Sequence, residues 1–122
     1  METLSKREFG NQLETFAKTI LEKEGCKIVA LNFQCKLGEI DIIARDGSTL
    51  IFVEVRYRKH ANFGGALASV DYKKQQKLIK TAQLYLIENK LTNNTSCRFD
   101  VFAIEGPVNR LEYNWLKNAF TE

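Results

Sequence analysis

The sequence GEIDIIARDGSTLIFVEVRYR, residues 38–58, predicts one β-hairpin. Two runs rich in Ile, Val, Phe and Leu flank the dipeptide Asp46-Gly47, which supplies the positive φ angles that a tight hairpin turn needs. The turn also fixes which residues face each other across the two strands. We therefore interpret the rest of the chain as support for this hairpin.

The register of the hairpin follows from the length of its loop. With an even loop centred on Asp46-Gly47, Asp41 faces Phe52, and Glu39 faces Glu54. Side chains alternate between the faces of a strand. One face then carries Glu39, Asp41, Glu54, Arg56 and Arg58. The other, the expected core face, carries Ile40, Ile42, Val53, Val55 and Tyr57. A three-residue loop would flip one strand and separate these groups.

Carboxylates gathered on one strand face predict a positively charged partner, because like charges that face each other across strands destabilise the pair. Asp41 and Glu54 would be diagonal neighbours with Cβ atoms roughly 7 Å apart or less. Both could then bind one hard cation through oxygen, with Arg56 beside it. The alternative is a solvated antiparallel face with alternating charge.

This arrangement resembles the active-site pattern of the PD-(D/E)XK nuclease superfamily, in which an Asp on one strand precedes Glu-x-Lys on the next. Asp41 and Glu54-Val55-Arg56 match it except at the last residue, where Arg56 replaces the lysine. The wider pattern resembles the YraN family of bacterial proteins, which is similar to the archaeal Holliday-junction resolvases. The motifs that carry this resemblance are Gly10-x-x-x-Glu14, Gly38-Glu39-Ile40-Asp41, Phe52-Val53-Glu54-Val55-Arg56, Phe63-Gly64-Gly65, Lys74-Gln75 and Arg98-Phe99-Asp100-Val101.

The resemblance implies an α/β fold with a restriction-endonuclease-like three-layer core. Its mixed five-stranded sheet would be flanked by helices in the order α-β-β-β-α-β-β. The resemblance further implies that Asp41, Glu54 and the Val55 carbonyl bind Mg, or Mn, with Glu14 joining directly or through water. The catalytic residues would be Asp41, Glu54, Arg56 and Glu14. From the residues alone, Glu14 could instead be an exposed carboxylate paired with Lys18 at i+4.

The remaining segments predict the other elements. Ser5 and Glu8 form a capping-box pattern that begins a helix, and Gly25 ends it. A strand over residues 27–36 would form a three-strand meander with the hairpin. Later elements are expected as a helix over residues 70–89, a strand over Ser96–Glu105 parallel to the hairpin's second strand, a short strand over residues 110–113 and one or two helical turns over residues 114–120.

Several polar residues lie on elements expected next to the hairpin. Arg58 and Lys59 follow its second strand, and Lys74 and Gln75 lie in the first turns of the second helix. We expect these four residues to bind substrate. We expect Lys73, Lys77 and Lys80 on the outward side of that helix. His60 is a lone loop histidine, more often solvated than catalytic, and Asp100 is expected to be structural, pairing with an arginine.

Length and composition predict a single domain over residues 1–122, large enough to bury roughly two thirds of its unfolded surface. The three cysteines lack CxxC spacing, so neither a disulfide framework nor a zinc site is expected. The N-terminus is polar and no apolar run approaches membrane-spanning length, which predicts a cytoplasmic protein without a membrane partner. The net charge of +3 does not by itself indicate nucleic acid.

The leading hypothesis is a metal-dependent nuclease that hydrolyses a phosphodiester in DNA, including branched or damaged DNA. Arg56 makes efficient water activation doubtful, because an arginine stays protonated and cannot act as a base. The first alternative is therefore a catalytically weak or inactive nucleic-acid-binding module on a nuclease scaffold. The second is a protein-interaction adaptor whose acidic cluster binds no metal. The resolvase resemblance also implies a homodimer.

Overall fold

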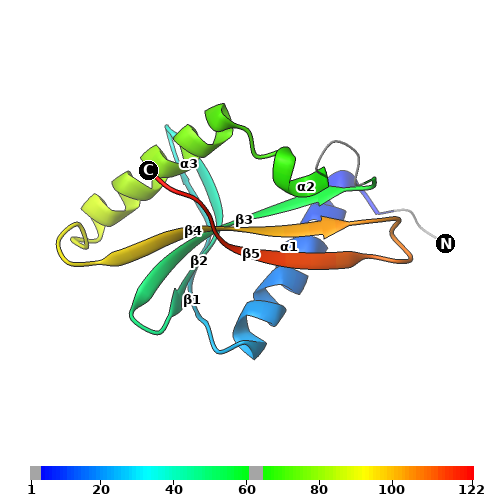
Figure 1. The fold of residues 1–122 in the computed structure, drawn as a ribbon, viewed down its shortest axis with the longest axis horizontal. Helices are drawn as coiled ribbons and strands as arrows, with labels where there is room; N and C mark the ends of the chain where they lie inside the picture. Colours follow the sequence, from blue (N-terminus) through cyan, green and yellow to red (C-terminus); the bar gives the residue numbers. More distant parts are fainter. Residues whose placement is uncertain (1–3, 61–64) are drawn as a thin grey trace.

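The computed structural model describes residues 4–60 and 65–122, which form one five-stranded sheet with helices on both faces (Figure 1). The elements are, in order, α1 (Lys6–Lys23), β1 (Lys27–Cys35), β2 (Gly38–Asp46), β3 (Thr49–Arg58), α2 (Gly65–Ala68), α3 (Tyr72–Glu88), β4 (Ser96–Glu105) and β5 (Glu112–Phe120). The strands lie side by side in chain order. Only β3 and β4 are parallel, joined through α2 and α3. The predicted mixed sheet and element order are confirmed, with α2 as an addition.

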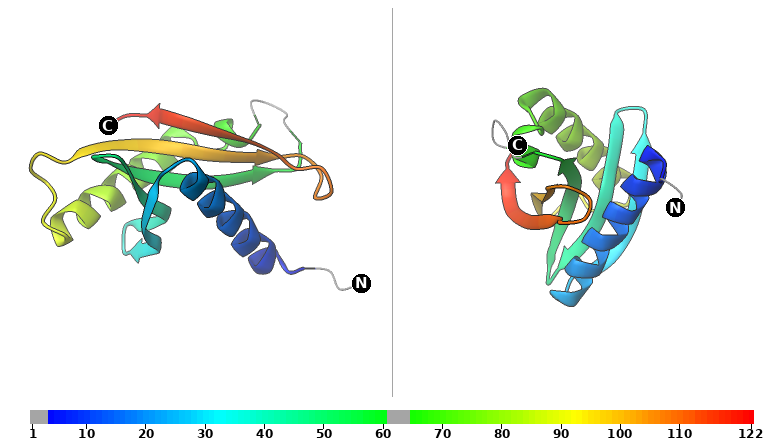
Figure 2. Two further views of the ribbon diagram at one scale, coloured as in Figure 1. Left: turned by 90° about the horizontal axis from the view of Figure 1, so that it is seen from below. Right: turned by 90° about the vertical axis from the view of Figure 1, so that its right-hand side faces the viewer.

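The sheet separates two hydrophobic cores, and Figure 2 shows the helices on either side of it. On one face, Leu21 of α1 packs in a cluster with Ile42 and Phe102. On the other, Leu78 of α3 packs in a cluster with Phe52. Both faces of the central strands are therefore buried, which explains why β3 and β4 read as continuous apolar runs.

The ends of α1 follow the sequence prediction. The backbone N–H of Glu8 donates to Ser5 Oγ at 3.1 Å, and Ser5 Oγ lies 3.0 Å from Glu8 Oε1. At the other end Gly25 has a φ of +94°, and its N–H donates to the Glu22 carbonyl. Both signals act locally, which is why the sequence alone could locate them.

The hairpin forms, but its predicted register is wrong by two residues. Asp46 pairs with Thr49 and Ile42 with Val53, so the loop is Gly47-Ser48 rather than centred on Asp46-Gly47. The predicted pairs Asp41 with Phe52 and Glu39 with Glu54 do not occur. The loop still has an even length, so the alternation along β3 is as predicted.

The prediction that Ile40 and Ile42 share one face is also wrong. Ile40 packs in the α3-side core and Ile42 in the α1-side core, so β2 reverses its faces between them, at Asp41. On the neighbouring strand β1, Asn32 lies opposite Asp41, because Leu31 pairs with Ile42 and Phe33 pairs with Ile40. The φ of Asn32 is 52°. The acidic residues consequently do not all lie on one face.

The predicted helical turns at residues 114–120 are wrong, because β5 continues as a strand to Phe120. Its register against β4 shifts between Phe99 and Val101. The buried carboxylate of Asp100 fills this irregularity, accepting hydrogen bonds from Trp115 Nε1 at 2.8 Å and Asn118 N at 2.9 Å. Asp100 also accepts from Arg98 Nε at 2.9 Å, which confirms the predicted structural role and arginine partner.

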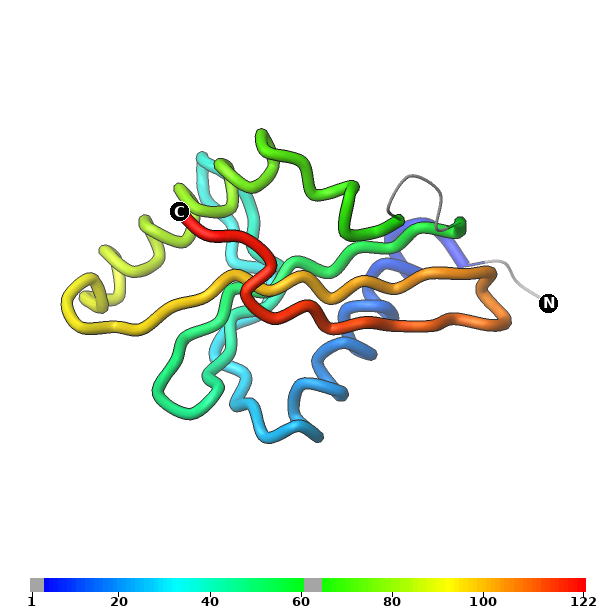
Figure 3. The backbone as a smooth tube through the Cα atoms, viewed as in Figure 1, coloured from blue at the N-terminus to red at the C-terminus, as the bar shows by residue number. Residues whose placement is uncertain are grey.

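The turn between β1 and β2 reaches the surface of α3, as the tube in Figure 3 shows. A Cβ at Gly38 would lie 2.9 Å from Thr81 Oγ1, so only glycine allows this close approach. Of the described cysteines, Cys26 is buried, Cys35 and Cys97 are half-buried, and all three are free. Within residues 4–60 and 65–122, no helix is long and apolar enough to cross a membrane.

Candidate functional site

The candidate site lies where β2 and β3 separate, beyond the pair of Ile42 with Val53. There the side chain of Asp41 replaces a backbone carbonyl as the acceptor between the two strands, because its Oδ2 accepts a hydrogen bond from Val55 N at 2.8 Å. Glu54, next along β3, is only 5% exposed, and its carboxyl hydrogen-bonds to that of Asp41. The structure therefore brings two predicted metal ligands into direct contact.

The neighbouring carboxyl of Glu54 changes the chemistry of Asp41, whose side chain is half-buried. Burial, then the charge of Glu54 and the hydrogen bond to it, raise the pKa of Asp41 from 3.8 to about 9, against the lowering effect of the Val55 N–H. This raised pKa favours the protonated form of Asp41 at neutral pH. Such a pair is electrostatically prepared to exchange this proton for a cation.

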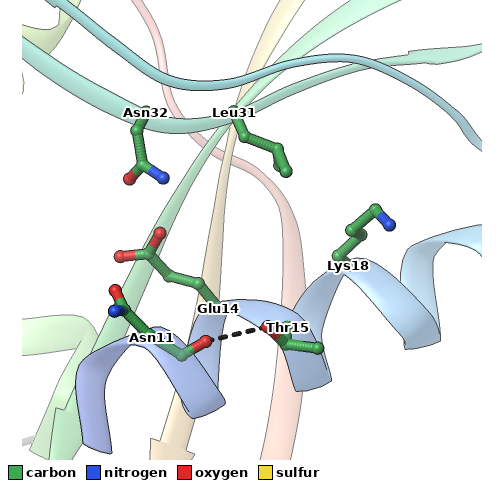
Figure 4. Close-up of a pocket in the computed structure, with 6 residues that line it drawn as sticks. All are labelled: Asn11, Glu14, Thr15, Lys18, Leu31 and Asn32. Carbon is green, nitrogen blue, oxygen red and sulfur yellow. Dashed lines mark hydrogen bonds between the residues drawn. The ribbon is translucent and has the colours of Figure 1, made fainter. Parts of the chain in front are cut away.

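A second pair of carboxylates approaches from the α1 side of the sheet. Glu14 projects from α1 toward Asn32 on β1, as Figure 4 shows. In the amide orientation that satisfies both acceptors, Asn32 Nδ2 donates to Glu14 Oε1 at 2.8 Å and Glu39 Oε1 at 3.2 Å. Burial, followed by the charge of Glu39, raises the pKa of Glu14, while the Asn32 hydrogen bond lowers it. Glu14 also lies within electrostatic reach of Glu54.

A pocket of about 290 Å³ opens beside Glu14, lined by Asn11, Glu14, Thr15, Lys18, Leu31 and Asn32 (Figure 4). The ion pair of Lys18 is with Glu22, at 3.8 Å, rather than with Glu14. The alternative role of Glu14 as a surface partner of Lys18 is therefore wrong. The carboxylate instead faces the sheet, toward the other acidic residues.

Asn32 is the residue that the sequence analysis missed. A φ of 52° is uncommon for a residue other than glycine, and asparagine tolerates it better than most. The detectable signal was an asparagine in the middle of an otherwise apolar strand, three residues before Cys35. Its amide holds Glu14 and Glu39 together.

Two cations neutralise Glu54 on the α3 side. Lys74 Nζ lies 3.4 Å from Glu54 Oε2, and Arg56 Nη1 lies 3.7 Å from the same oxygen. The other guanidinium nitrogens of Arg56 are used elsewhere, since Nε donates to Ser69 Oγ at 2.9 Å and Nη2 to the Ser69 carbonyl at 3.1 Å. Arg56 and Lys74 are thus both at the site, as the sequence predicted.

The comparisons with known proteins agree with one another. The model of the "Uncharacterised protein family UPF0102" matches residues 13–104. The chain belongs to this family. It is 46% identical over 121 residues to a UPF0102 protein of Pseudomonas syringae pv. syringae, covering 98% of each chain. It is also 47% identical over 111 residues to one from Stutzerimonas stutzeri, covering 91% of this chain and 92% of the relative. The YraN-like family membership predicted from the motifs is confirmed.

Other predicted substrate residues of this UPF0102 protein lie farther from the carboxyls. Arg58 is exposed four residues beyond Glu54, about 13 Å along the strand. Lys59 lines a separate pocket of about 210 Å³ with Pro107 and Arg110. His60 is exposed as well. The amide of Gln75 donates to the Val70 carbonyl at 3.0 Å, a contact that stabilises the start of α3.

The loop motif is only partly described. Phe63 and Gly64 lie outside the described residues. Gly65 begins α2 with a φ of +63°, and its missing Cβ leaves room for the carboxylate of Glu105, which accepts from Ala66 N at 2.9 Å. The space beside Gly65 therefore holds a carboxylate that fixes α2.

The donor set of the UPF0102 site consists of oxygen atoms from Glu14, Glu39, Asp41 and Glu54. Carboxylate oxygens suit hard cations such as Mg²⁺. The four groups are arranged as two pairs, and in the part of the chain that the structure describes no three of them already surround one point. The Asp41–Glu54 pair is thus the part of the site that fits a cation directly. The homodimer and the cytoplasmic location stay predictions.

Proposed function

We propose that this protein is a metal-dependent nuclease that hydrolyses phosphodiesters in DNA, including branched or damaged DNA. The observation that carries the proposal is the contact between the half-buried carboxyl of Asp41 and the buried carboxyl of Glu54, with Asp41 held by the Val55 N–H. Neighbouring carboxyls with a raised pKa are typical of ligand-binding and catalytic sites, because two like charges in contact disfavour ionisation of both. A divalent cation is the ligand that their oxygen chemistry favours.

The residues divide into two groups by charge. Asp41 and Glu54 would hold Mg²⁺ or Mn²⁺ with the Val55 carbonyl, and Glu14 would join directly or through water. When bound, such a cation polarises the scissile phosphate and lowers the pKa of the attacking water. Arg56 and Lys74, which pair with Glu54, supply positive charge where the phosphate carries negative charge. Arg58 and Lys59 would contact the DNA backbone farther along β3.

The test combines cation binding with cleavage. Mg²⁺ should raise the melting temperature of the natural protein, because a ligand that binds only the folded state stabilises it. It should also support slow cutting of at least one of three DNAs: single-stranded, duplex or four-way junction. Asp41→Asn and Glu54→Gln should each abolish the thermal gain and the cutting, because each removes a ligand charge.

The matched control is Glu88→Gln, which changes an exposed glutamate at the end of α3. It should keep both the thermal gain and the cutting. An undiminished thermal gain in the double variant Asp41→Asn/Glu54→Gln would place the cation elsewhere and contradict the proposal.

A non-catalytic nucleic-acid-binding module is the second candidate, favoured by the arrangement at Arg56. Its guanidinium is permanently charged and is tied to Ser69, so it does not serve as a base. Salt-sensitive DNA binding without cutting, at any cation concentration, would select this candidate. A protein that neither binds nor cuts nucleic acid would direct attention to the adaptor hypothesis.

A further inference from the structure

A cationic pocket adjoins Glu54 on the α3 side of the sheet. It has a volume of about 270 Å³ and is lined by Arg56, Ser69, Asp71, Lys73, Lys74 and Lys77. The sequence analysis placed Lys73 and Lys77 on the outward side of α3, but both are exposed at the rim of this pocket. We call it the α3 pocket. It gathers four cationic side chains around one carboxylate.

One carboxylate, that of Asp71, does not balance the four cationic side chains of the α3 pocket. Asp71 is the N-cap of α3, and its Oδ1 accepts a hydrogen bond from Lys74 N at 2.9 Å. The first N–H groups of α3 also point toward this end of the helix. A negatively charged ligand is therefore the chemistry that the pocket favours, and its volume admits a phosphate group.

Arg56 and Lys74 differ in how many donors they have left for such a ligand. The Nε and Nη2 groups of Arg56 donate to Ser69, whose hydroxyl in turn donates to the Ala66 carbonyl. These contacts clamp β3 to the turn that follows α2. Arg56 thus fixes the wall of the α3 pocket, and little of its hydrogen-bonding capacity faces the interior.

Lys74 is the less constrained of the two. Its side chain is 40% exposed, and within the described residues the ion pair with Glu54 at 3.4 Å is its only charged contact. An ammonium has three donors, so two can face the pocket while one faces Glu54. A cation held by Glu54 would weaken the attraction between Glu54 and Lys74, and the Lys74 ammonium would then be available to an anion.

We propose that the α3 pocket binds a backbone phosphate of the nucleic acid, with Lys74 as the residue that contacts this phosphate and Arg56 as a positioning residue. The proposal rests on the proposed function, since it names the substrate subsite of the same site. It has a specific consequence: a divalent cation and DNA strengthen each other's binding, and this coupling passes through Lys74.

The experiment measures the affinity of a short fluorescein-labelled DNA duplex by anisotropy, in EDTA and with Ca²⁺ in place of Mg²⁺ to limit hydrolysis. For the natural protein, Ca²⁺ should tighten binding. Lys74→Gln should weaken binding about tenfold with Ca²⁺ present, the size expected for one charge-assisted hydrogen bond. It should also lose most of the tightening by Ca²⁺.

Three further variants separate the pocket from general surface charge. Lys80→Gln removes an exposed lysine from α3 outside the pocket lining and should change the affinity less than about twofold. Lys73→Gln/Lys77→Gln should weaken binding equally with and without Ca²⁺, because neither residue pairs with Glu54. Arg56→Lys keeps a positive charge beside Glu54 but loses the Ser69 contacts, so it should lower the melting temperature and weaken DNA binding with Ca²⁺ less than Lys74→Gln does.

The outcomes also distinguish this proposal from the nuclease proposal. If no DNA is cut but Lys74→Gln loses the Ca²⁺-dependent affinity, the pocket assignment stands and the nuclease proposal fails. If cutting depends on Asp41 and Glu54 while a folded Lys74→Gln binds like the natural protein, the pocket assignment is overturned alone. Equal losses in Lys74→Gln and Lys80→Gln would likewise overturn it, because they would indicate diffuse charge.

Discussion

Two regions of the sheet bury acidic side chains in opposite ways. Asp100 is fully buried, and both of its oxygens accept hydrogen bonds from nearby groups: Arg98, Trp115 and the backbone of Asn118. Asp41 and Glu54 instead face each other. Asp41 accepts one backbone hydrogen bond, from Val55 N, and the two cations near Glu54, Lys74 and Arg56, lie 3.4 and 3.7 Å from its Oε2. The first carboxylate is satisfied by the fold. The Asp41–Glu54 pair has fewer hydrogen-bond donors, and its balancing charges come from Arg56 and Lys74.

This difference supports a structural role for Asp100 and the proposed functional role of Asp41 and Glu54, without reference to sequence motifs. Both Asp100 and Asp41 fall in motifs shared with the family pattern, so the motif alone gives them equal standing. The number of hydrogen-bond donors around each carboxylate does distinguish the two residues. A buried acid surrounded by fixed donors stabilises the protein as it is, whereas one that meets another acid is prepared for a ligand.

The largest expected effect is the loss of Asp100. Asp100→Asn places an NH₂ group against two donors and leaves Arg98 without its main carboxylate, so it should lower the free energy of unfolding by about 3–5 kcal/mol. Urea denaturation measures this loss, which should be the same with Mg²⁺ and with EDTA. Asp46→Asn is the control, because Asp46 contacts the same Arg98 but is 36% exposed, and it should cost less than about 1 kcal/mol.

If Mg²⁺ restored the stability that Asp100→Asn loses, the contrast between the two regions would fail, because Asp100 would then be connected to the cation site.

A smaller effect is expected from pH in the region of Asp41. The pKa of Asp41 is 3.8 in the unfolded chain and is raised to about 9 in the folded protein. Between these two pH values the folded protein keeps a proton that the unfolded chain releases. Stability in EDTA should therefore fall as the pH rises, by about 2–4 kcal/mol between about pH 5 and about pH 8. Asp41→Asn has no such proton to lose and should show a much flatter profile.

Mg²⁺ sharpens the same measurement, because it should restore stability at the upper end of that range in the natural protein only. Stability that rises with pH in EDTA, or an unchanged slope in Asp41→Asn, would show that Asp41 does not have a raised pKa in the folded protein.

The smallest effect compares two asparagines that share a φ of 52°. Asn118 acts through its backbone N–H on Asp100, whereas Asn32 acts through its side-chain amide on Glu14 and Glu39. Glycine suits this backbone conformation. Asn118→Gly should therefore change the stability by less than about 0.5 kcal/mol, and Asn32→Gly should cost about 1 kcal/mol through its lost hydrogen bonds.

Denaturation of both variants in EDTA checks this pair. Equal costs would mean that the Asn32 amide does not hold the two carboxylates together.

The sequence was informative wherever a structural signal was local. Ser5 with Glu8 and the hairpin turn near Gly47 depend on residues within a few positions of each other, and both were predicted. The crossover to a parallel β4 followed from the length of the connection. Asp41, Glu54 and Arg56 were identified from the hairpin pattern, whereas Glu14 and Lys74 were identified through the family resemblance and the predicted helices.

The errors have non-local causes. The register of the hairpin depends on whether Asp46 ends the strand or enters the loop, and a shift of two residues keeps the same pattern of faces. β5 extends to Phe120 because Asp100, far away in the chain, binds Trp115 and Asn118. Asn32 was missed because its role depends on Glu14 from a different element. None of these contacts leaves a periodic pattern in the sequence.

The order of strands in the sheet, β1 to β5 without exchange, bears on how the site is assembled during folding. Strands joined by short turns pair quickly, because little chain must be closed between them. The chain up to Arg58 already contains Glu14, Asp41 and Glu54. On the ribosome these acids are therefore synthesised, and able to meet, before Ser69 and Lys74 emerge. Docking of α3 would then be the late event that completes the charge balance of the nascent protein.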